Sequence, residues 1–176
     1  MQSQESSSKF NNRKLGKVAK VVDVQSEVMQ YLTFFLGKEM FAVDILVIKE
    51  ILQYGEVTSV PLMPPYLRGV INLRGAVVPV IDLAYRLGKG LSAEAKRSCI
   101  VILEVPIGQQ VVNLGMMVDA VSAVIDIAKD QIEAAPALGG TVRTDFIAGM
   151  GKLPSGFVII LDVAHIFSGG ELESLA

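Results

Sequence analysis

The chain has 176 residues, of which 51% are hydrophobic and 19% are charged, a composition typical of compact globular proteins rather than disordered or fibrous ones. Its 16 lysines and arginines against 18 aspartates and glutamates give a formal net charge of −2. Residues 1–26 contribute +3 of this charge, so −5 remains for residues 27–176. An acidic body is a poor platform for nucleic acid, because binding nucleic acid depends on neutralising phosphates.

The apolar segments are too short to cross a membrane. Every run is interrupted well before the roughly 20 residues that a spanning helix needs, as Asp162 interrupts the run 156–163. The N-terminal MQSQESSSKF has no stretch of the kind a secretory signal requires, so we expect a cytoplasmic protein without membrane insertion. Cys99 is the only cysteine, which excludes an intrachain disulfide and a thiolate-based metal site.

The two ends differ in composition from the body. Residues 1–26 are rich in Ser, Gln, Asn and Lys and are predicted to be a flexible basic leader. Such a leader can contact acidic partners or a membrane, but simple solvation is the favoured interpretation. Residues 169–176 are predicted to form an acidic C-terminal tail after a Gly-Gly stop.

Residues 27–168 are predicted to be mainly β, with short helices. Short β-branched runs alternate with Gly and Pro, and the period of Ile45, Ile48 and Leu52 suits a short helix or turn over 45–52. A second short helix is expected over 163–167. The strands expected in chain order are 31–37, 38–44, 56–60, 69–73, 76–83, 99–105, 110–118, 121–127, 146–153 and 156–161.

Ten short strands in two groups of five predict two small barrels, about 29–90 and 98–168. An internal repeat supports a duplication, because RGVINLRGAVVPVIDLAYRL parallels AGMGKLPSGFVIILDVAHIF at a constant offset of 80. The shared positions are Gly69 and Gly149, Leu73 and Leu153, Val78 and Val158, Asp82 and Asp162, and Ala84 and Ala164.

No pattern of residues indicates catalysis. His165 is the single histidine and lies in an apolar segment, and no G-x-S-x-G elbow supplies a nucleophile for a hydrolase. One His and one Cys cannot build the usual metal sites, and neither glycine-rich nucleotide motif occurs. We therefore expect no enzymatic activity, no metal and no cofactor, although a hydrolase or a small-barrel nucleic-acid module would be the alternatives from other classes.

The informative polar residues lie on a hairpin. Asn72 and Arg74 stand at its head, and Gly75 supplies the positive φ that a tight turn needs. Arg74 is expected to project from the tip, where it can make a charge-assisted contact. Glu50 is its expected carboxylate partner within the chain, unless Glu50 meets a cation of another protein.

These residues carry a family resemblance. The run YLRGVINLRGAVVPVIDLAYRLG, preceded by VDILVIKEI, resembles the signature of the CheW family of chemotaxis coupling proteins, and the resemblance spans about residues 29–168. It implies a fold of two five-stranded SH3-like barrels. It also implies a non-enzymatic adaptor that couples the cytoplasmic tips of methyl-accepting chemoreceptors to the regulatory domain of the histidine kinase CheA, recruited to membrane-associated receptor arrays.

The resemblance also implies site residues. Glu50 and Arg74 match the family's acidic and basic pair near the coupling surfaces, and Asn72 and Gly75 complete the hairpin motif. The remaining positions expected to face partners are Ile45, Ile48, Val118 and Val121, the last two toward the receptor. A paralogous adaptor serving gliding, pilus-based motility or another kinase pathway is the alternative within the family.

Overall fold

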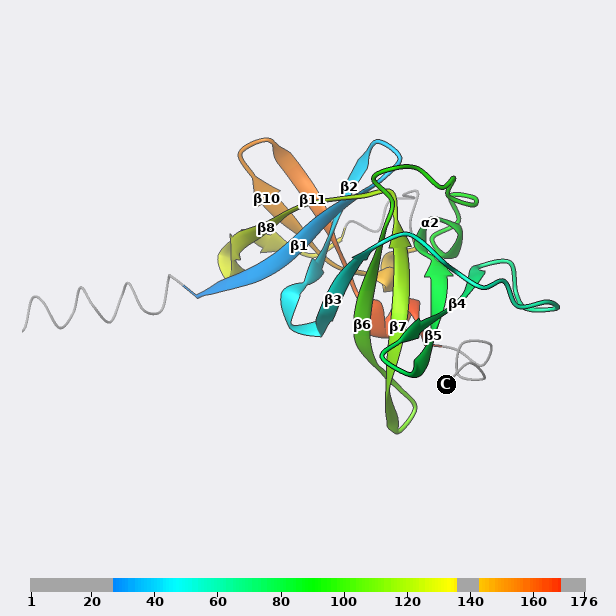
Figure 1. The fold of residues 1–176 in the computed structure, drawn as a ribbon. Coiled ribbons are helices and arrows are strands. Elements are labelled where there is room, and N and C mark those ends of the chain that lie inside the picture. The colour runs from blue at the N-terminus through cyan, green and yellow to red at the C-terminus, as the bar shows by residue number, and fades with distance from the viewer. Residues whose placement is uncertain (1–26, 136–142, 169–176) are drawn as a thin grey trace, which may run out of the picture.

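The computed structural model describes residues 27–135 and 143–168, so the expected leader 1–26 and tail 169–176 lie outside the described residues. The described chain forms eleven strands with short helical turns (Figure 1). In chain order the elements are β1 (Val28–Leu36), β2 (Glu39–Asp44), η1 (Ile45–Val47), β3 (Ile48–Gln53), β4 (Leu67–Leu73), β5 (Ala76–Asp82), α2 (Leu83–Arg86), β6 (Cys99–Ile107), β7 (Gln110–Val118), β8 (Ala120–Ala128), η2 (Lys129–Gln131), β9 (Ile132–Glu133), η3 (Thr144–Phe146), β10 (Ile147–Leu153), β11 (Gly156–Leu161) and α3 (Val163–Ile166).

The strands form two sheets that follow one plan. The six-stranded sheet has the order β8-β1-β2-β11-β10-β9, and the five-stranded sheet has the order β3-β6-β7-β5-β4. Each sheet joins two antiparallel hairpins through one parallel pair, β2 with β11 in the first and β5 with β7 in the second. The expected mainly β fold with two lobes is confirmed, and the two-residue β9 adds a sixth strand to one sheet.

The five-stranded sheet is built from the consecutive strands β3 to β7, which are inserted between β2 and β8 of the six-stranded sheet. β3 follows β2 along the chain but pairs with β6 in the other sheet, and β8 follows β7 but pairs with β1. The expected boundaries of the barrels, 29–90 and 98–168, are therefore wrong, because each sheet combines segments from both ranges. We refer below to the six-stranded lobe and the five-stranded lobe, seen on the left and right of Figure 1.

The chain enters the second sheet at a short turn. The Asp44 carboxylate accepts a hydrogen bond from the backbone N–H of Leu46 at 2.9 Å and caps the single 3-10 turn η1. β3 follows at once, with half-buried and exposed residues in strict alternation. The helix expected over 45–52 is thus mostly a strand, because the apolar residues at 48 and 52 fit a period of two as well as a helical period.

The strand expected at 56–60 is reduced to one isolated bridge, Thr58 with Val70. The bridge places the edge of β4 against this segment so closely that Gly69 has no room for a side chain. A Cβ on Gly69 would lie 2.2 Å from the carbonyl oxygen of Thr58. In the other lobe, β9 pairs with β10 at the equivalent place, and a Cβ on Gly149 would meet Ile132 at 2.7 Å.

The repeat is therefore structural as well as sequential. β4–β5–α2 and β10–β11–α3 both carry a β-bulge next to the shared glycine. Asp82 and Asp162 both cap the helix that follows, accepting from the N–H of Tyr85 and of His165 respectively. The shared Asp is explained by this capping role.

Three apolar clusters hold the fold together. The largest lies between the sheets and takes Leu32, Phe34 and Leu36 from β1, whereas Tyr31 packs inside the six-stranded lobe. A third cluster, around Ile102, fills the five-stranded lobe. Because β1 has apolar neighbours on both faces, its sequence is almost continuously apolar. Each large apolar side chain buried in this way contributes roughly 1.5–3 kcal/mol to the free energy of folding.

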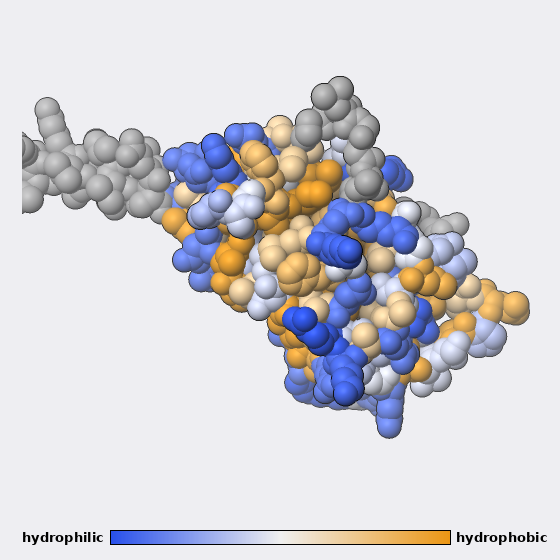
Figure 2. Space-filling view, turned by 90° about the horizontal axis from the view of Figure 1, so that it is seen from above, coloured by the Kyte–Doolittle hydropathy of each residue, from blue (hydrophilic) through white to orange (hydrophobic). Residues whose placement is uncertain are grey.

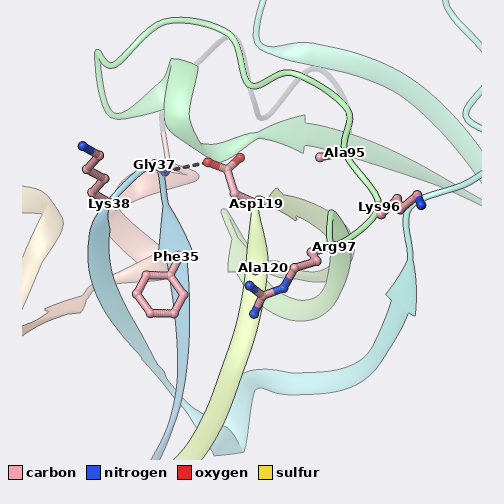
Figure 3. Close-up of a pocket in the computed structure, with 8 residues that line it drawn as sticks. All are labelled: Phe35, Gly37, Lys38, Ala95, Lys96, Arg97, Asp119 and Ala120. Atoms are coloured by element: carbon pink, nitrogen blue, oxygen red, sulfur yellow. Dashed lines mark hydrogen bonds between the residues drawn. The ribbon is translucent and has the colours of Figure 1, made fainter.

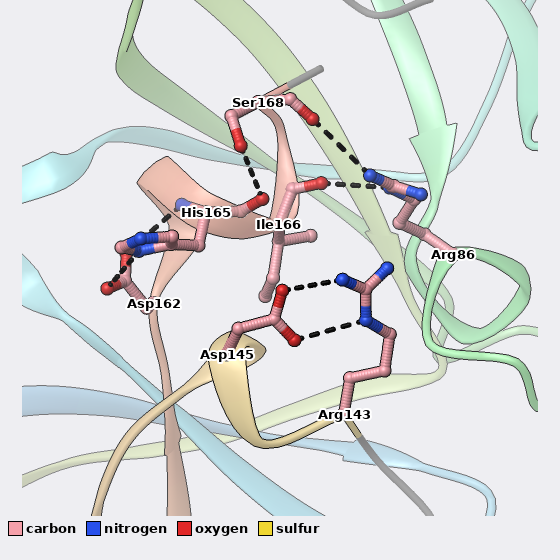
Figure 4. Close-up of polar contacts among 7 residues, drawn as sticks. All are labelled: Arg86, Arg143, Asp145, Asp162, His165, Ile166 and Ser168. Carbon is pink, nitrogen blue, oxygen red and sulfur yellow. Dashed lines mark hydrogen bonds and ion pairs between the residues drawn. The ribbon is translucent and has the colours of Figure 1, made fainter.

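The two short helices join the lobes at a second place (Figure 4). Arg86 of α2 donates from Nε to the carbonyl of Ile166 in α3 at 2.8 Å, and its guanidinium lies 5.3 Å from the ring centroid of Phe146. Arg143 lies over the same ring at 4.6 Å and pairs with Asp145. A cation from one lobe therefore caps the C-terminal end of the helix in the other.

We expect Gly69→Ala to lower the free energy of unfolding by more than about 3 kcal/mol, because the new methyl group would collide with the backbone of Thr58 and the residue has a φ of +146°. Gly108→Ala is the matched control. Gly108 also has a positive φ, but a Cβ there would have no atom within 4 Å. We therefore expect this variant to lose only about 1 kcal/mol of the free energy of unfolding. Urea denaturation followed by circular dichroism measures both, and equal losses would contradict the steric explanation.

Candidate interaction surface

Glu50 and Arg74 form a bidentate ion pair. Arg74 Nη1 lies 2.9 Å from Glu50 Oε2, and Nη2 lies 3.0 Å from Oε1. The side chain of Arg74 is 70% exposed and that of Glu50 is 26% exposed. The expected partnership within the chain is therefore present, and much of the Arg74 side chain is still exposed, where it can contact another protein.

The turn that presents Arg74 is tight. Arg74 has a φ of +52° and Gly75 a φ of +88°, the two successive positive values of a two-residue hairpin turn. The side-chain oxygen of Asn72 accepts from the Gly75 N–H at 2.8 Å and fixes the turn. Asn would suit the position of Arg74 better, because a left-handed conformation is costly for Arg. Arg74 therefore occupies a position at which it makes the turn less stable than Asn would.

The ion pair also links the two edges of one sheet. Glu50 lies on β3 and Arg74 follows β4, and these are the first and last strands of the five-stranded sheet. The sheet must curl until its edges meet for the pair to form. Leu52 and Leu73 pack against the same cluster beneath the pair, inside the lobe. The pair therefore closes the lobe at its surface.

Two of the expected apolar contacts are half-buried. Ile45 and Ile48 both pack against the cluster between the sheets, which leaves only part of each side chain accessible. Leu46 lies between them and is 81% exposed. It was missed because the helical period assigned it to no apolar face, whereas the capped turn η1 points it outward. A partner on this edge would meet Leu46 first.

The prediction for Val118 is wrong. Its side chain is 0% exposed in the cluster between the sheets, so it offers no surface to a partner. Apolar residues that end a strand look alike in sequence whether they face the core or solvent. Val121 is half-buried on β8, opposite Phe34, and stays a prediction.

Each repeat exposes an apolar residue at the second position of the strand that follows its hairpin turn. Val77 is 72% exposed and Phe157, at the equivalent position, is 55% exposed. Viewed from above, the apolar surface forms several separate patches bordered by hydrophilic residues (Figure 2). Small apolar patches with polar rims are the usual form of protein-binding surfaces.

Most ion pairs of the described residues stand alone, although Arg68 meets both Asp82 and Glu94. His165 Nδ1 lies 2.7 Å from Asp162 Oδ2 on an exposed helix end. Across residues 27–135 and 143–168, no group of three or more His, Cys, Asp or Glu is placed to hold a metal ion. In the same part of the chain, no helix is long and apolar enough to cross a membrane.

Fold and surface together define a class of protein. Two packed β lobes present an ion pair, hairpin tips and small apolar patches to other proteins. Comparison with known proteins agrees. The family model of the CheW-like domain matches residues 30–171. The chain therefore belongs to the CheW-like family, whose members are non-enzymatic chemotaxis adaptors.

Individual relatives cover most of the chain. It is 34% identical over 143 residues to the chemotaxis protein CheW of Klebsiella aerogenes, which covers 81% of this chain and 84% of the relative. It is 30% identical over 157 residues to CheW of Treponema pallidum, covering 87% and 90%. The crystal structure of the scaffolding protein TtCheW from Thermoanaerobacter tengcongensis is similar, with a TM-score of 0.74, 34% identity, and coverage of 85% of this chain and 94% of that one.

Two Arg74 variants separate the contribution of the turn to stability from the contribution of the ion pair. Arg74→Ala loses the pair and keeps the costly left-handed φ, so we expect the free energy of unfolding to fall by up to about 1 kcal/mol. Arg74→Asn loses the same pair but gains a better turn residue, and its stability should equal or exceed that of the parent chain. Urea titrations measure both variants. An Asn variant less stable than the Ala variant would refute this account of the turn.

Proposed function

We propose that this chain couples the cytoplasmic tip of a methyl-accepting chemoreceptor to the regulatory domain of the histidine kinase CheA, and that these partners recruit it to membrane-associated receptor arrays. Membership of the CheW-like family supports the adaptor role. The observation that carries the finer proposal is the Glu50–Arg74 pair, a charged group held at the tip of a stiff hairpin with 70% of the Arg74 side chain exposed.

The two lobes suit the transmission of a small movement. A partner that displaces one lobe also displaces strands that continue into the other, because β2 leads directly into β3 and β7 into β8. The cluster between the sheets is close-packed and deforms little. We infer that the adaptor acts as a rigid link between receptor and kinase and stores no separate conformational state.

Contacts can be assigned to parts of the surface. We assign Glu50, Arg74, Asn72 and Gly75 to a charge-assisted contact at the hairpin tip. A second set, at the junction of the lobes, comprises Ile45, Ile48 and Val121, to which the exposed Leu46 is now added. Contacts of this size are individually weak, so repeated contacts in an array would supply the overall affinity.

Receptor-dependent kinase activity in a reconstituted mixture of chain, CheA and receptor tests this proposal. We expect Arg74→Asn and Glu50→Gln each to reduce coupling by about tenfold, because truncating one partner of an interfacial charge pair commonly costs this much or more. Both variants should remain folded. Coupling that survives both substitutions unchanged would refute the assignment of the pair.

The exposed ion pair between Glu27 and Lys129 provides the matched control. Its atoms are 3.2 Å apart and its side chains are 60% and 64% exposed, on the other lobe. Lys129→Gln removes one charge, as Arg74→Asn does, and should leave coupling within about twofold of the parent. Co-purification of CheA and a receptor fragment with each variant shows which partner is lost.

A further inference from the structure

A hollow lies where the two lobes meet, away from the Glu50–Arg74 pair (Figure 3). It is open and has a volume of about 680 Å³. One side is the end of the β1–β2 hairpin and the start of β8, and the other is the loop that leads into β6. The lining residues are Phe35, Gly37, Lys38, Ala95, Lys96, Arg97, Asp119 and Ala120.

Several lysine and arginine side chains that line the hollow have no carboxylate partner within the part of the chain that the structure describes. Most lysines and arginines of the described chain pair with a carboxylate or donate to a carbonyl. Those for which the described residues supply neither are Lys38, Lys96, Arg97 and Lys152. All but Lys152 line the hollow, on a protein whose residues 27–176 carry a net charge of −5.

Both cationic turns are held in place. Ala95 and Ser98 form a closed turn, with Ser98 N–H donating to the Ala95 carbonyl at 3.1 Å and the Ser98 hydroxyl oxygen accepting from Ala95 N–H at 3.0 Å. This turn presents Lys96 and Arg97 at its tip. Across the hollow, Gly37 N–H donates to Asp119 Oδ2 at 2.6 Å and fixes the turn that carries Lys38.

The loop before this turn is anchored by Arg68. Its guanidinium donates to the carbonyl of Ser92 at 3.2 Å and lies 3.7 Å from the buried carboxylate of Asp82. Burial opposes the charge of Arg68, but a hydrogen bond to Tyr54 and the nearby carboxylates of Asp82 and Glu94 raise the pKa of its guanidinium above the ordinary value. Arg68 therefore stays charged, and its contacts hold this loop in position.

We propose that this hollow binds an acidic peptide segment of a partner protein, one in which carboxylates flank an apolar residue. In Figure 3, Lys38 and Lys96 lie on opposite sides of the hollow, and Arg97 extends toward Phe35 and Ala120. Separated cations around an apolar floor match spaced carboxylates around an apolar side chain.

The same geometry disfavours a compact anion such as phosphate. The carboxylate of Asp119 lies within the hollow and already occupies the Gly37 N–H, so the backbone offers this amide to no ligand. A dense negative charge would be repelled by Asp119, whereas a peptide can place its carboxylates at the rim. The inference stands on these contacts alone and does not depend on the coupling role proposed above.

Fluorescence anisotropy with purified full-length chain and a labelled peptide, GELELEG, tests the proposal. The peptide should bind, and GQLQLQG and GESESEG should each bind about tenfold more weakly, since one lacks the charge and the other the apolar residues. Lys38→Glu combined with Arg97→Glu should weaken binding by a similar factor, and Lys38→Gln with Arg97→Gln by less. Among residues 27–135 and 143–168, Lys152 is the one unpaired lysine outside the hollow, and Lys152→Glu should leave binding unchanged.

Other outcomes overturn the proposal. Absence of GELELEG binding, or equal loss in Lys152→Glu, would show that the hollow is not a specific site. Binding of inorganic phosphate or of phosphatidylglycerol vesicles in preference to the peptide would identify a different ligand. Tighter peptide binding after deletion of residues 169–176 would show that the chain's own acidic tail competes for the site as its natural occupant. A chain that couples CheA to receptors but does not bind the peptide refutes only this inference.

Discussion

The insertion of one lobe into the other is the constraint on which the rest of the molecule depends. The five-stranded lobe is built from the consecutive strands β3 to β7, and the six-stranded lobe from β1, β2 and β8 to β11 on either side of it. The lobes are therefore joined by two direct connections, β2 to β3 and β7 to β8, and they bury a cluster between them to which β1, β2, β6 and β7 all contribute. Within the inserted lobe β3 and β4 are the two edge strands, so Glu50 and Arg74 meet only where that sheet curls until its edges come together.

Much of the local structure could be predicted from the sequence. Strand bounds near the Arg74-Gly75 turn were correct, because turn residues and short apolar runs are local signals. The repeat, too, was visible, since Gly69 fills a place with no room for a side chain and Asp82 fills a helix-capping place that favours few residue types. The partner of each strand could not be predicted. β3 fits either sheet by its alternation, and pairing is decided by contacts remote in sequence.

The surface residues, too, divide into those that the sequence predicts and those that it does not. The Glu50–Arg74 pair was expected because both residues belong to a distinctive motif, and the structure joins them. Val118 was misassigned, because a valine at a strand end carries no sign of which face is buried. The basic hollow escaped notice for another reason: Gly37 and Asp119 are 82 positions apart, and Lys96 and Arg97 are ordinary charges until the fold sets them opposite Lys38.

The insertion has a consequence for synthesis on the ribosome. β1 and β2 are made before the five-stranded lobe, yet their sheet cannot be completed until β8, β10 and β11, which follow that lobe along the chain, have emerged. During that interval β1 and β2 expose apolar faces and an unpaired edge, the condition in which nascent chains aggregate or recruit chaperones. The inserted lobe thus delays the protection of the first two strands until all five of its own strands have been made.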